Sequence, residues 1–313
     1  MTRAFVFPGQ GSQAVGMGRD LAANFAIARQ TFDEVDAALA QPLSALMFEG
    51  PEDQLTLTEN AQPALMAVSV AVLRVLQAEK GLDLARHARF VAGHSLGEYS
   101  ALCAAGALTL ADTARLLKLR GQSMQKAVPV GVGAMAAILG ADLDAAREIA
   151  AAASAEREVC TAANDNAPGQ VVVSGHKTAV ERAMKIAAER GFKRAILLPV
   201  SAPFHCPLMQ PAADAMAEAL AATTICAPVV PVVANVTAEA VSDPAAIRSL
   251  LVQQVTGAVR WRESVLYMKA QGVTELVELG AGKVLAGLAK RIDKDLAALS
   301  VGTPADVAAF GPV

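Results

Sequence analysis

The sequence predicts an α/β protein in which a large domain, built on a parallel sheet, is interrupted by a small inserted subdomain. Short β-favouring apolar runs alternate with longer helical patterns, as in parallel sheets covered by helices. Between residues 128 and 200 the predicted order becomes strand, helix, strand, strand, helix, strand, which is the ferredoxin-like order. The 313 residues, of which 54% are apolar and 18% charged, can bury a sizeable core.

The first part of the large domain, residues 1–127, begins with a buried strand at Ala4–Phe7. Pro8 and Gly9 stop this strand and lead into the loop Gly9–Gln13. The elements expected next are helices at about 19–39 and 63–80, a strand at 89–92, a turn at 93–97, and helices at 98–105 and 110–126.

A linker containing Pro129, Gly131 and Gly133 opens the insert, residues 128–200. We expect its strands at 134–139, 159–163, 170–174 and 195–200, and its helices at 143–153 and 179–190. The chain then returns to the large domain, residues 201–313, with a helix at 211–221, strands near 229–234 and at 275–279, and a helix at 282–291.

Charge and composition exclude several classes of protein. The 27 basic and 30 acidic residues give a net charge of −3 without a basic run, so no nucleic-acid partner is expected. Polar residues interrupt every apolar stretch before the roughly 20 residues of a membrane span. The N-terminus lacks a signal-peptide core and the four cysteines lack paired spacing, so we expect a reducing, cytoplasmic location, no membrane and no metal.

The turn Gly93-His94-Ser95-Leu96-Gly97 is a G-x-S-x-G sequence between a predicted strand and a predicted helix. In that context the serine side chain stands at the top of an α/β-hydrolase-like sheet, near backbone N–H groups of the helix N-terminus. Ser95 is therefore the candidate nucleophile. The alternative is a tight turn in which Ser95 only caps the helix.

A serine nucleophile needs a base, and the chain has four histidines. His205 is the candidate, because it lies where the insert returns to the large domain, whereas His176 is expected in a surface turn of the insert. The alternative is a partly buried structural histidine. Asp165 is the only loop acid between Ser95 and His205 that looks exposed by pattern, and its segment is at least as typical of a turn. We therefore expect a Ser–His pair that is oriented by something other than a carboxylate.

Arg120 falls at the edge of the apolar face of its predicted helix. A guanidinium that is partly withdrawn from water needs an anionic partner, and its forked geometry suits a carboxylate. From the pattern alone, a salt bridge within the fold is the first interpretation and a bound anion the second.

Six ordered segments carry a resemblance to a known family: FPGQGSQ at 7–13, GHSLGEYSAL at 93–102, LRGQSMQ at 119–125, NDNAPGQVVVSG at 164–175, SAPFHCPLM at 201–209 and QQVTGAVRW at 253–261. Together they resemble the malonyl-CoA:acyl carrier protein transacylases over nearly the whole chain. The resemblance implies ping-pong transfer of malonyl from malonyl-CoA, through an ester on Ser95, to the phosphopantetheine thiol of holo acyl carrier protein in fatty acid synthesis. His205 would act as base and then as acid.

The resemblance also implies the remaining site residues. Backbone N–H groups of Gln10 and Leu96 would form the oxyanion hole, and an amide acceptor at Gln254 would orient His205. Substrate-binding positions are implied at Arg120, which would grip the malonyl carboxylate, at Asn166 in an asparagine-rich loop, and at Phe204, which matches a malonyl-preferring pattern.

Three other functions compete with this one. A trans-acting acyltransferase of polyketide assembly would carry the same motifs. A serine thioesterase would need no carboxylate clamp, so Arg120 argues against it. A non-catalytic docking scaffold should have lost Ser95 or His205. We expect a monomer that needs no cofactor beyond its thioester substrate and the carrier's phosphopantetheine.

Overall fold

The computed structural model describes residues 1–155, 157–200 and 202–311. Glu156, Ser201 and the last two residues lie outside the described part. Ser201 is the first residue of the segment predicted to return to the large domain.

The larger sheet has six strands in the order β10-β9-β1-β2-β7-β8. The central strand β1 (Arg3–Phe7) pairs in parallel with β2 (Ala88–Gly93) and β9 (Glu275–Leu279). The parallel part extends to β10 (Ala297–Val301) and β7 (Val232–Val233), and β8 (Ala240–Val241) pairs antiparallel at one edge. The predicted α/β class is confirmed.

The helices of this part of the molecule are α1 (Arg19–Asn24), α2 (Ala26–Leu39), α3 (Leu43–Glu49), α4 (Glu52–Thr56), α5 (Thr58–Lys80), α6 (Leu84–His87), α7 (Gly97–Ala104), α8 (Leu110–Ala127), the short 3-10 helix η1 (Pro207–Met209), α11 (Gln210–Ala222), α12 (Pro244–Thr256), α13 (Trp261–Ala270), α14 (Val284–Ile292) and α15 (Pro304–Ala309).

Both faces of the sheet are buried, because side chains alternate along each strand. Phe5 and Phe7 of β1 face a core that includes α2, α5 and α8, whereas Ala4 and Val6 face α13 and α14. Burial on both faces accounts for the continuous apolar run that marked this strand in the sequence.

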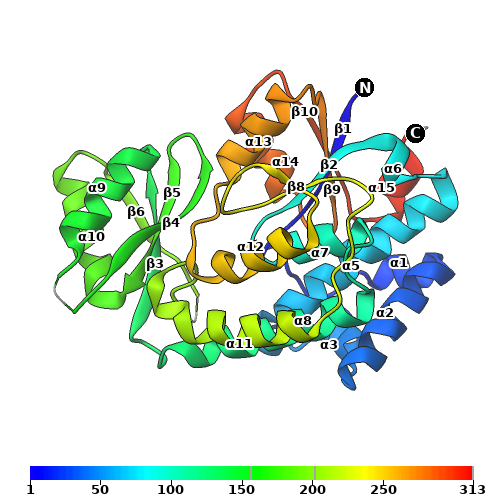
Figure 1. Cartoon of the computed structure of the whole chain (residues 1–313), viewed down its shortest axis with the longest axis horizontal. Helices are drawn as coiled ribbons and strands as arrows, with labels where there is room; N and C mark the ends of the chain where they lie inside the picture. Colours follow the sequence, from blue (N-terminus) through cyan, green and yellow to red (C-terminus); the bar gives the residue numbers. More distant parts are fainter. Residues whose placement is uncertain (156, 201, 312–313) are drawn as a thin grey trace.

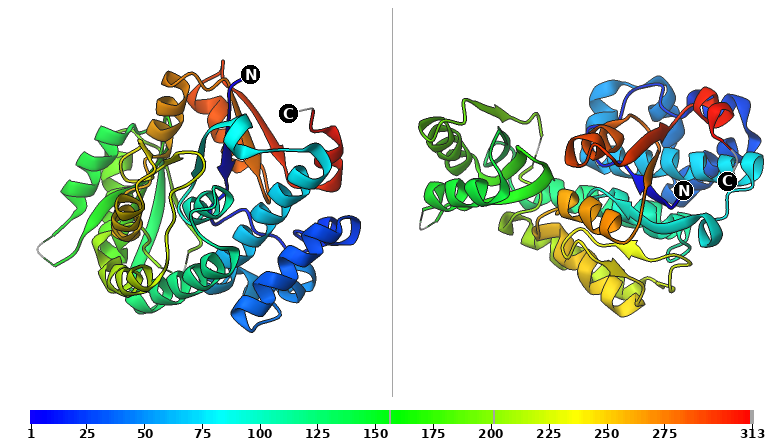
Figure 2. Two further views of the ribbon diagram at one scale, coloured as in Figure 1. Left: turned by 45° about the vertical axis from the view of Figure 1, so that its right-hand side comes forward. Right: turned by 90° about the horizontal axis from the view of Figure 1, so that it is seen from above.

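The smaller sheet has the order β4-β5-β3-β6, and all of its pairs are antiparallel. Its elements are β3 (Gly133–Leu139), α9 (Leu143–Ala153), β4 (Cys160–Ala167), β5 (Gln170–His176), α10 (Lys177–Glu189) and β6 (Arg194–Leu197). This is the ferredoxin-like arrangement, with α9 and α10 on one face. Figures 1 and 2 show this unit, in green, at one end of the molecule.

Several elements differ from the predictions. The helix expected at 19–39 is two helices, because Phe25 has an extended backbone between α1 and α2. The strand expected at 159–163 continues as β4 to Ala167, where it pairs with β5. The helix expected at 63–80 begins at Thr58, so Pro63 lies inside it. Helix α5 is long and apolar enough to cross a membrane by length and composition, contrary to the sequence analysis, but most of it is buried inside the protein.

Candidate active site

Ser95 stands in the sharp turn between β2 and α7, at the carboxyl end of the central strands. Its φ is +51°, in the left-handed region that serine rarely adopts. The two glycines of the motif are required by close approach. A Cβ at Gly93 would lie 1.9 Å from the main chain of Gly97, and one at Gly97 would lie 2.2 Å from the carbonyl oxygen of Phe7. The turn is thus pressed against the ends of β1 and β2, and it presents the hydroxyl outward.

His205 meets Ser95 as predicted, with 2.7 Å between Nε2 and the serine Oγ. Its other ring nitrogen, Nδ1, lies 2.9 Å from the main-chain oxygen of Gln254 and 3.1 Å from that of Gly257. Because both neighbours of Nδ1 are acceptors, Nδ1 carries the proton and Nε2 is free to accept one from Ser95. Burial, with the nearby Arg120 charge, lowers the pKa of His205 to about 3, so the ring is neutral at physiological pH.

The position of Arg120 is set by close packing of α8 on the first turn of α5. A Cβ at Gly121 would lie 2.5 Å from the Cα of Glu59, so only glycine allows this approach. Arg120 is 1% exposed and donates to Gln62 Oε1 at 2.8 Å, Gln254 Oε1 at 2.8 Å and Ser95 Oγ at 3.3 Å.

The salt bridge considered for Arg120 within the fold is absent from the described ion pairs. Its Nε has no hydrogen-bond partner in the described chain. Burial lowers the pKa of Arg120 from its ordinary value, and the guanidinium remains charged near neutral pH. A buried cation held only by neutral oxygens favours the second interpretation, a bound anion.

The main chain and the side chain of Gln254 contact different groups of the site. Its main-chain carbonyl, rather than its side-chain amide, contacts His205. The side-chain Nε2 donates to the main-chain oxygen of Ser95 at 3.0 Å and to Glu98 Oε2 at 2.8 Å. Gln254 thereby touches the candidate nucleophile, base and anion-binding residue at once.

Ser95, His205 and Arg120 line a cavity of about 520 Å³ between the two sheets. Gln10, Leu96, Asn166 and Phe204 line it too, together with Met135 and Val172 of the small sheet. No described hydrogen bond uses the main-chain N–H of Gln10 or Leu96. The cavity therefore brings together the site residues that the sequence analysis named, except Gln254, which is buried and contacts three of them, and the small sheet supplies one wall.

Asn166 lies beside the Ser95 turn, with its Oδ1 2.8 Å from Nε2 of His94. Burial lowers the pKa of His94, whose ring also packs against Trp261 at 5.8 Å between centroids. The prediction of an exposed loop acid at Asp165 is wrong. Asp165 lies in β4, is 1% exposed, and accepts two hydrogen bonds from Arg262 at 2.9 and 3.1 Å. His176, expected in a surface turn, ends β5 and accepts from the N–H of Val159.

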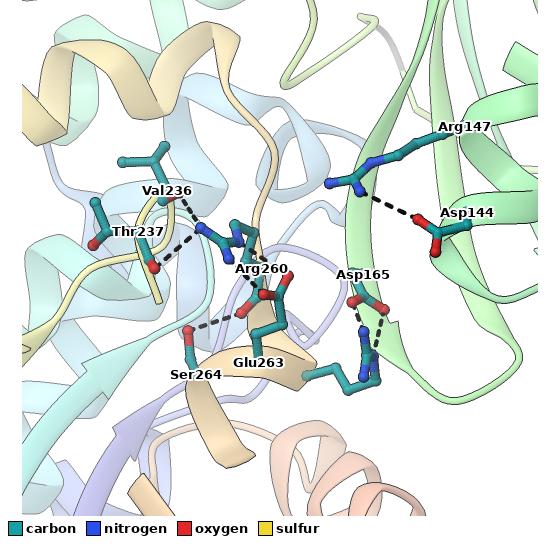
Figure 3. A network of polar contacts seen from close by, with 9 residues as sticks. Asp144, Arg147, Asp165, Val236, Thr237, Arg260, Glu263 and Ser264 are labelled. Atoms are coloured by element: carbon teal, nitrogen blue, oxygen red, sulfur yellow. Dashed lines mark hydrogen bonds and ion pairs between the residues drawn. The ribbon is translucent and has the colours of Figure 1, made fainter. Parts of the chain in front are cut away.

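Figure 3 shows the hydrogen bonds and ion pairs that hold the segment after Gln254 in place. Arg260 donates to the main-chain oxygens of Val236 and Thr237 at 3.2 and 3.1 Å and pairs with Glu263. On the other side, the Arg262–Asp165 pair ties α13 to β4. The segment that follows the carbonyls orienting His205 is thus held both to the connection between β7 and β8 and to β4.

Three residues of the site were not identified by the sequence analysis. Gln62 holds Arg120, Asn235 Oδ1 accepts the N–H of Ser95 at 2.8 Å, and Glu98 accepts from Gln254. Glu98 stands inside the quoted motif, but an acid in the first turn of a helix is usually a solvent-exposed partner of the helix dipole. Gln62 and Asn235 carry no local signal, because their roles depend on contacts between distant segments.

The arrangement can support nucleophilic acyl chemistry on a group with a negative charge. It offers a hydroxyl bonded to a neutral imidazole, free N–H groups beside it and a buried guanidinium 3.3 Å away. Within the described ranges, no group of three or more His, Cys, Asp or Glu side chains could hold a metal ion.

Comparisons with known proteins agree with this chemistry. Residues 4–298 match the model of the acyl transferase domain family. The malonyl CoA-acyl carrier protein transacylase of Salmonella typhimurium is 51% identical over 98% of this chain and 97% of its own. Among solved structures, an acyl-carrier-protein S-malonyltransferase from Bartonella henselae is 58% identical, with a TM-score of 0.96 over 99% of this chain and 98% of that one. A malonyl-transacylase solved with its type II PKS acyl-carrier protein is 45% identical, with a TM-score of 0.94 over 98% of each chain.

Proposed function

The chain belongs to the malonyl CoA-acyl carrier protein transacylase family, and from that premise we propose how its residues perform the transfer. The enzyme moves a malonyl group from malonyl-CoA to acyl carrier protein. The single observation that carries the proposed mechanism is the contact of Ser95 Oγ with both a neutral His205, at 2.7 Å, and the buried Arg120, at 3.3 Å.

In the first half-reaction, Ser95 Oγ attacks the thioester carbonyl while His205 Nε2 takes the serine proton. The developing oxyanion is bound by the N–H groups of Gln10 and Leu96. The carbon–sulfur bond then breaks, His205 returns the proton to the departing CoA thiolate, and malonyl remains as an ester on Ser95. In the second half-reaction His205 takes the proton of the phosphopantetheine thiol, and the thiolate attacks the ester carbonyl. The bond between the carbonyl carbon and Ser95 Oγ then breaks, His205 returns the proton to Oγ, and malonyl remains as a thioester on the carrier.

Arg120 would bind the free carboxylate of malonyl with its forked N–H groups. Phe204, Met135 and Val172 would contact the methylene and exclude water, which protects the ester from hydrolysis. This disfavours a thioesterase, which has no use for a buried cation beside its nucleophile.

Which acyl carrier protein accepts the malonyl group is a separate proposal. We propose that the acceptor is the carrier protein of fatty acid synthesis. A polyketide carrier is the alternative, because a malonyl-transacylase that is 45% identical to this chain was solved in complex with a type II PKS acyl-carrier protein. A monomeric state, a cytoplasmic location and independence of any cofactor stay predictions.

A two-step labelling experiment tests the function. The protein is incubated with radiolabelled malonyl-CoA, and the label is expected to stay on the protein after CoA is removed. Holo carrier protein is then added, and the label is expected to move to the carrier faster than it appears as free malonate. Carriers of both pathways are compared in parallel. Release of label into water at the rate of transfer would indicate a thioesterase instead.

Replacing His205 by alanine is expected to slow acylation of Ser95 by a factor of about 10² to 10⁴, the usual contribution of a positioned base. The remaining rate should rise with pH, because hydroxide must then remove the serine proton. Mass spectrometry of the malonyl-protein in a single turnover measures this. His87→Ala is the matched control, since His87 lies in α6, before β2 and at the opposite end of that strand from Ser95. An unchanged rate in His205→Ala would assign the base elsewhere.

A further inference from the structure

A carboxyl group lies buried three residues after the nucleophile, on the first turn of α7. Glu98 is 3% exposed, and none of the described ion pairs includes it. Its Oε2 accepts from the main-chain N–H of Asn235 at 3.0 Å and from Gln254 Nε2 at 2.8 Å. Burying a carboxyl group without a paired cation is costly, so its presence beside the site calls for a reason.

Gln254 connects this carboxyl group to the anion-binding guanidinium. The amide Nε2 faces Glu98, and the amide Oε1 accepts from Arg120 at 2.8 Å. An acceptor-only carboxylate at one end and a donor-only guanidinium at the other allow a single orientation of the amide. Glu98, together with the main-chain oxygen of Ser95, therefore holds the Gln254 nitrogen on its own side, so that the amide oxygen faces Arg120.

We infer that Glu98 is a positioning residue of the acyl pocket, which through the Gln254 amide adjusts how strongly Arg120 holds an anionic acyl group. This inference rests on the proposed function, in which malonyl places its carboxylate at Arg120. Before malonyl binds, the two opposite charges, Glu98 and Arg120, balance each other across the amide. Malonyl adds a second negative charge on the far side of the guanidinium, and like charges disfavour the ionised form of Glu98.

Malonyl binding is consequently coupled to partial uptake of a proton from solvent by Glu98. Burial raises the pKa of Glu98 to about 7, while the hydrogen bonds from Gln254 and Asn235 and the charge of Arg120 oppose this rise. Near neutral pH the free protein thus holds a mixture of the two forms. Below pH 7 most of the Glu98 carboxyl is already neutral, so proton uptake does not reduce the free energy of malonyl binding. Above pH 7 the proton must be taken from solvent, so malonyl binding weakens as the pH rises.

The other titratable groups around Glu98 do not change charge between pH 7 and 8.5. Burial raises the pKa of Tyr99 above its ordinary value and lowers that of Arg120, which still leaves the phenol neutral and the guanidinium charged. Burial lowers the pKa of both His94 and His205, so both rings stay neutral above pH 7. A change in acyl selectivity between pH 7 and 8.5 would therefore come from Glu98.

The test is the ratio of kcat/KM for malonyl-CoA to that for acetyl-CoA, measured by competition between pH 6 and 8.5. Both substrates carry the same CoA, so titration of the CoA phosphates and of the catalytic groups cancels in the ratio. The wild-type ratio is expected to fall about tenfold across this range, if bound malonyl raises the pKa of Glu98 by about one unit. In Glu98→Gln the ratio should stay at the high, low-pH value throughout.

Glu278→Gln is the matched control. Like Glu98, Glu278 is a buried carboxyl group, and it accepts hydrogen bonds from the main-chain N–H groups of Leu285 and Ala286 at the start of α14. Glu278 itself lies in β9 and does not line the acyl cavity. In Glu278→Gln the malonyl-to-acetyl ratio of kcat/KM should depend on pH as it does in the wild type. A wild-type ratio that does not change with pH, or an equal slope in a folded Glu98→Gln protein, would overturn the inference. Failure of the wild type to form a malonyl adduct at any pH would instead overturn the proposed function.

Discussion

Replacing Ser95 by alanine is expected to abolish malonyl transfer, with a loss on the order of 10⁴-fold or more, because no other group can form the acyl ester. The fold should be retained within about 1 kcal/mol, since alanine has the same left-handed strain at this turn as serine. Mass spectrometry after incubation with malonyl-CoA should find no adduct.

Ser249→Ala is the control for this variant. Ser249 is an exposed residue of α12 and should keep full transfer. If the adduct persists in Ser95→Ala at the wild-type rate, the nucleophile is another residue and the 2.7 Å contact with His205 has only a structural role.

Much of the fold could be predicted, since parallel strands that are buried on both faces leave a continuous apolar run. The predicted strand at Glu275–Leu279 and helix at Leu143–Ala153 have the observed bounds. β10 was missed because it is an edge strand with a largely half-exposed pattern. α12 and α13 were not predicted either. They follow each other closely in the sequence, and which of their residues are buried becomes clear only from the tertiary packing.

The site could be predicted where local geometry dictates chemistry. The glycines around Ser95 are needed for close backbone contacts, and that need is visible as a motif. The positive φ of His205, +57°, has no such signature, because the loop before α11 and the carbonyls of Gln254 and Gly257 impose it from outside. The partners of Arg120 were equally hidden, since Gln62 and Gln254 lie 58 and 134 residues away in sequence.

Replacing Arg120 by alanine is expected to remove selectivity for malonyl over acetyl. In the wild type, an acetyl group leaves the buried guanidinium without an anion, at a cost of about 2 to 5 kcal/mol relative to malonyl. At about 1.4 kcal/mol per factor of ten, malonyl-CoA should be preferred by roughly 30- to 4,000-fold in kcat/KM. In Arg120→Ala, malonyl transfer should fall by a similar factor, while acetyl transfer should hold or rise.

Competition between the two thioesters measures this, with Arg115→Ala as the matched control. Arg115 lies on the same helix but is largely exposed and pairs with Asp112 one turn away, so its loss should leave the ratio unchanged. Arg120→Lys should give an intermediate ratio, because an ammonium keeps the charge and loses the fork. A clamp that recognises the malonyl carboxylate must act on one substrate and spare the other. If Arg120→Ala slows both substrates equally, Arg120 supports the pocket through Gln62 and Gln254 alone, and selectivity arises from the shape of the cavity.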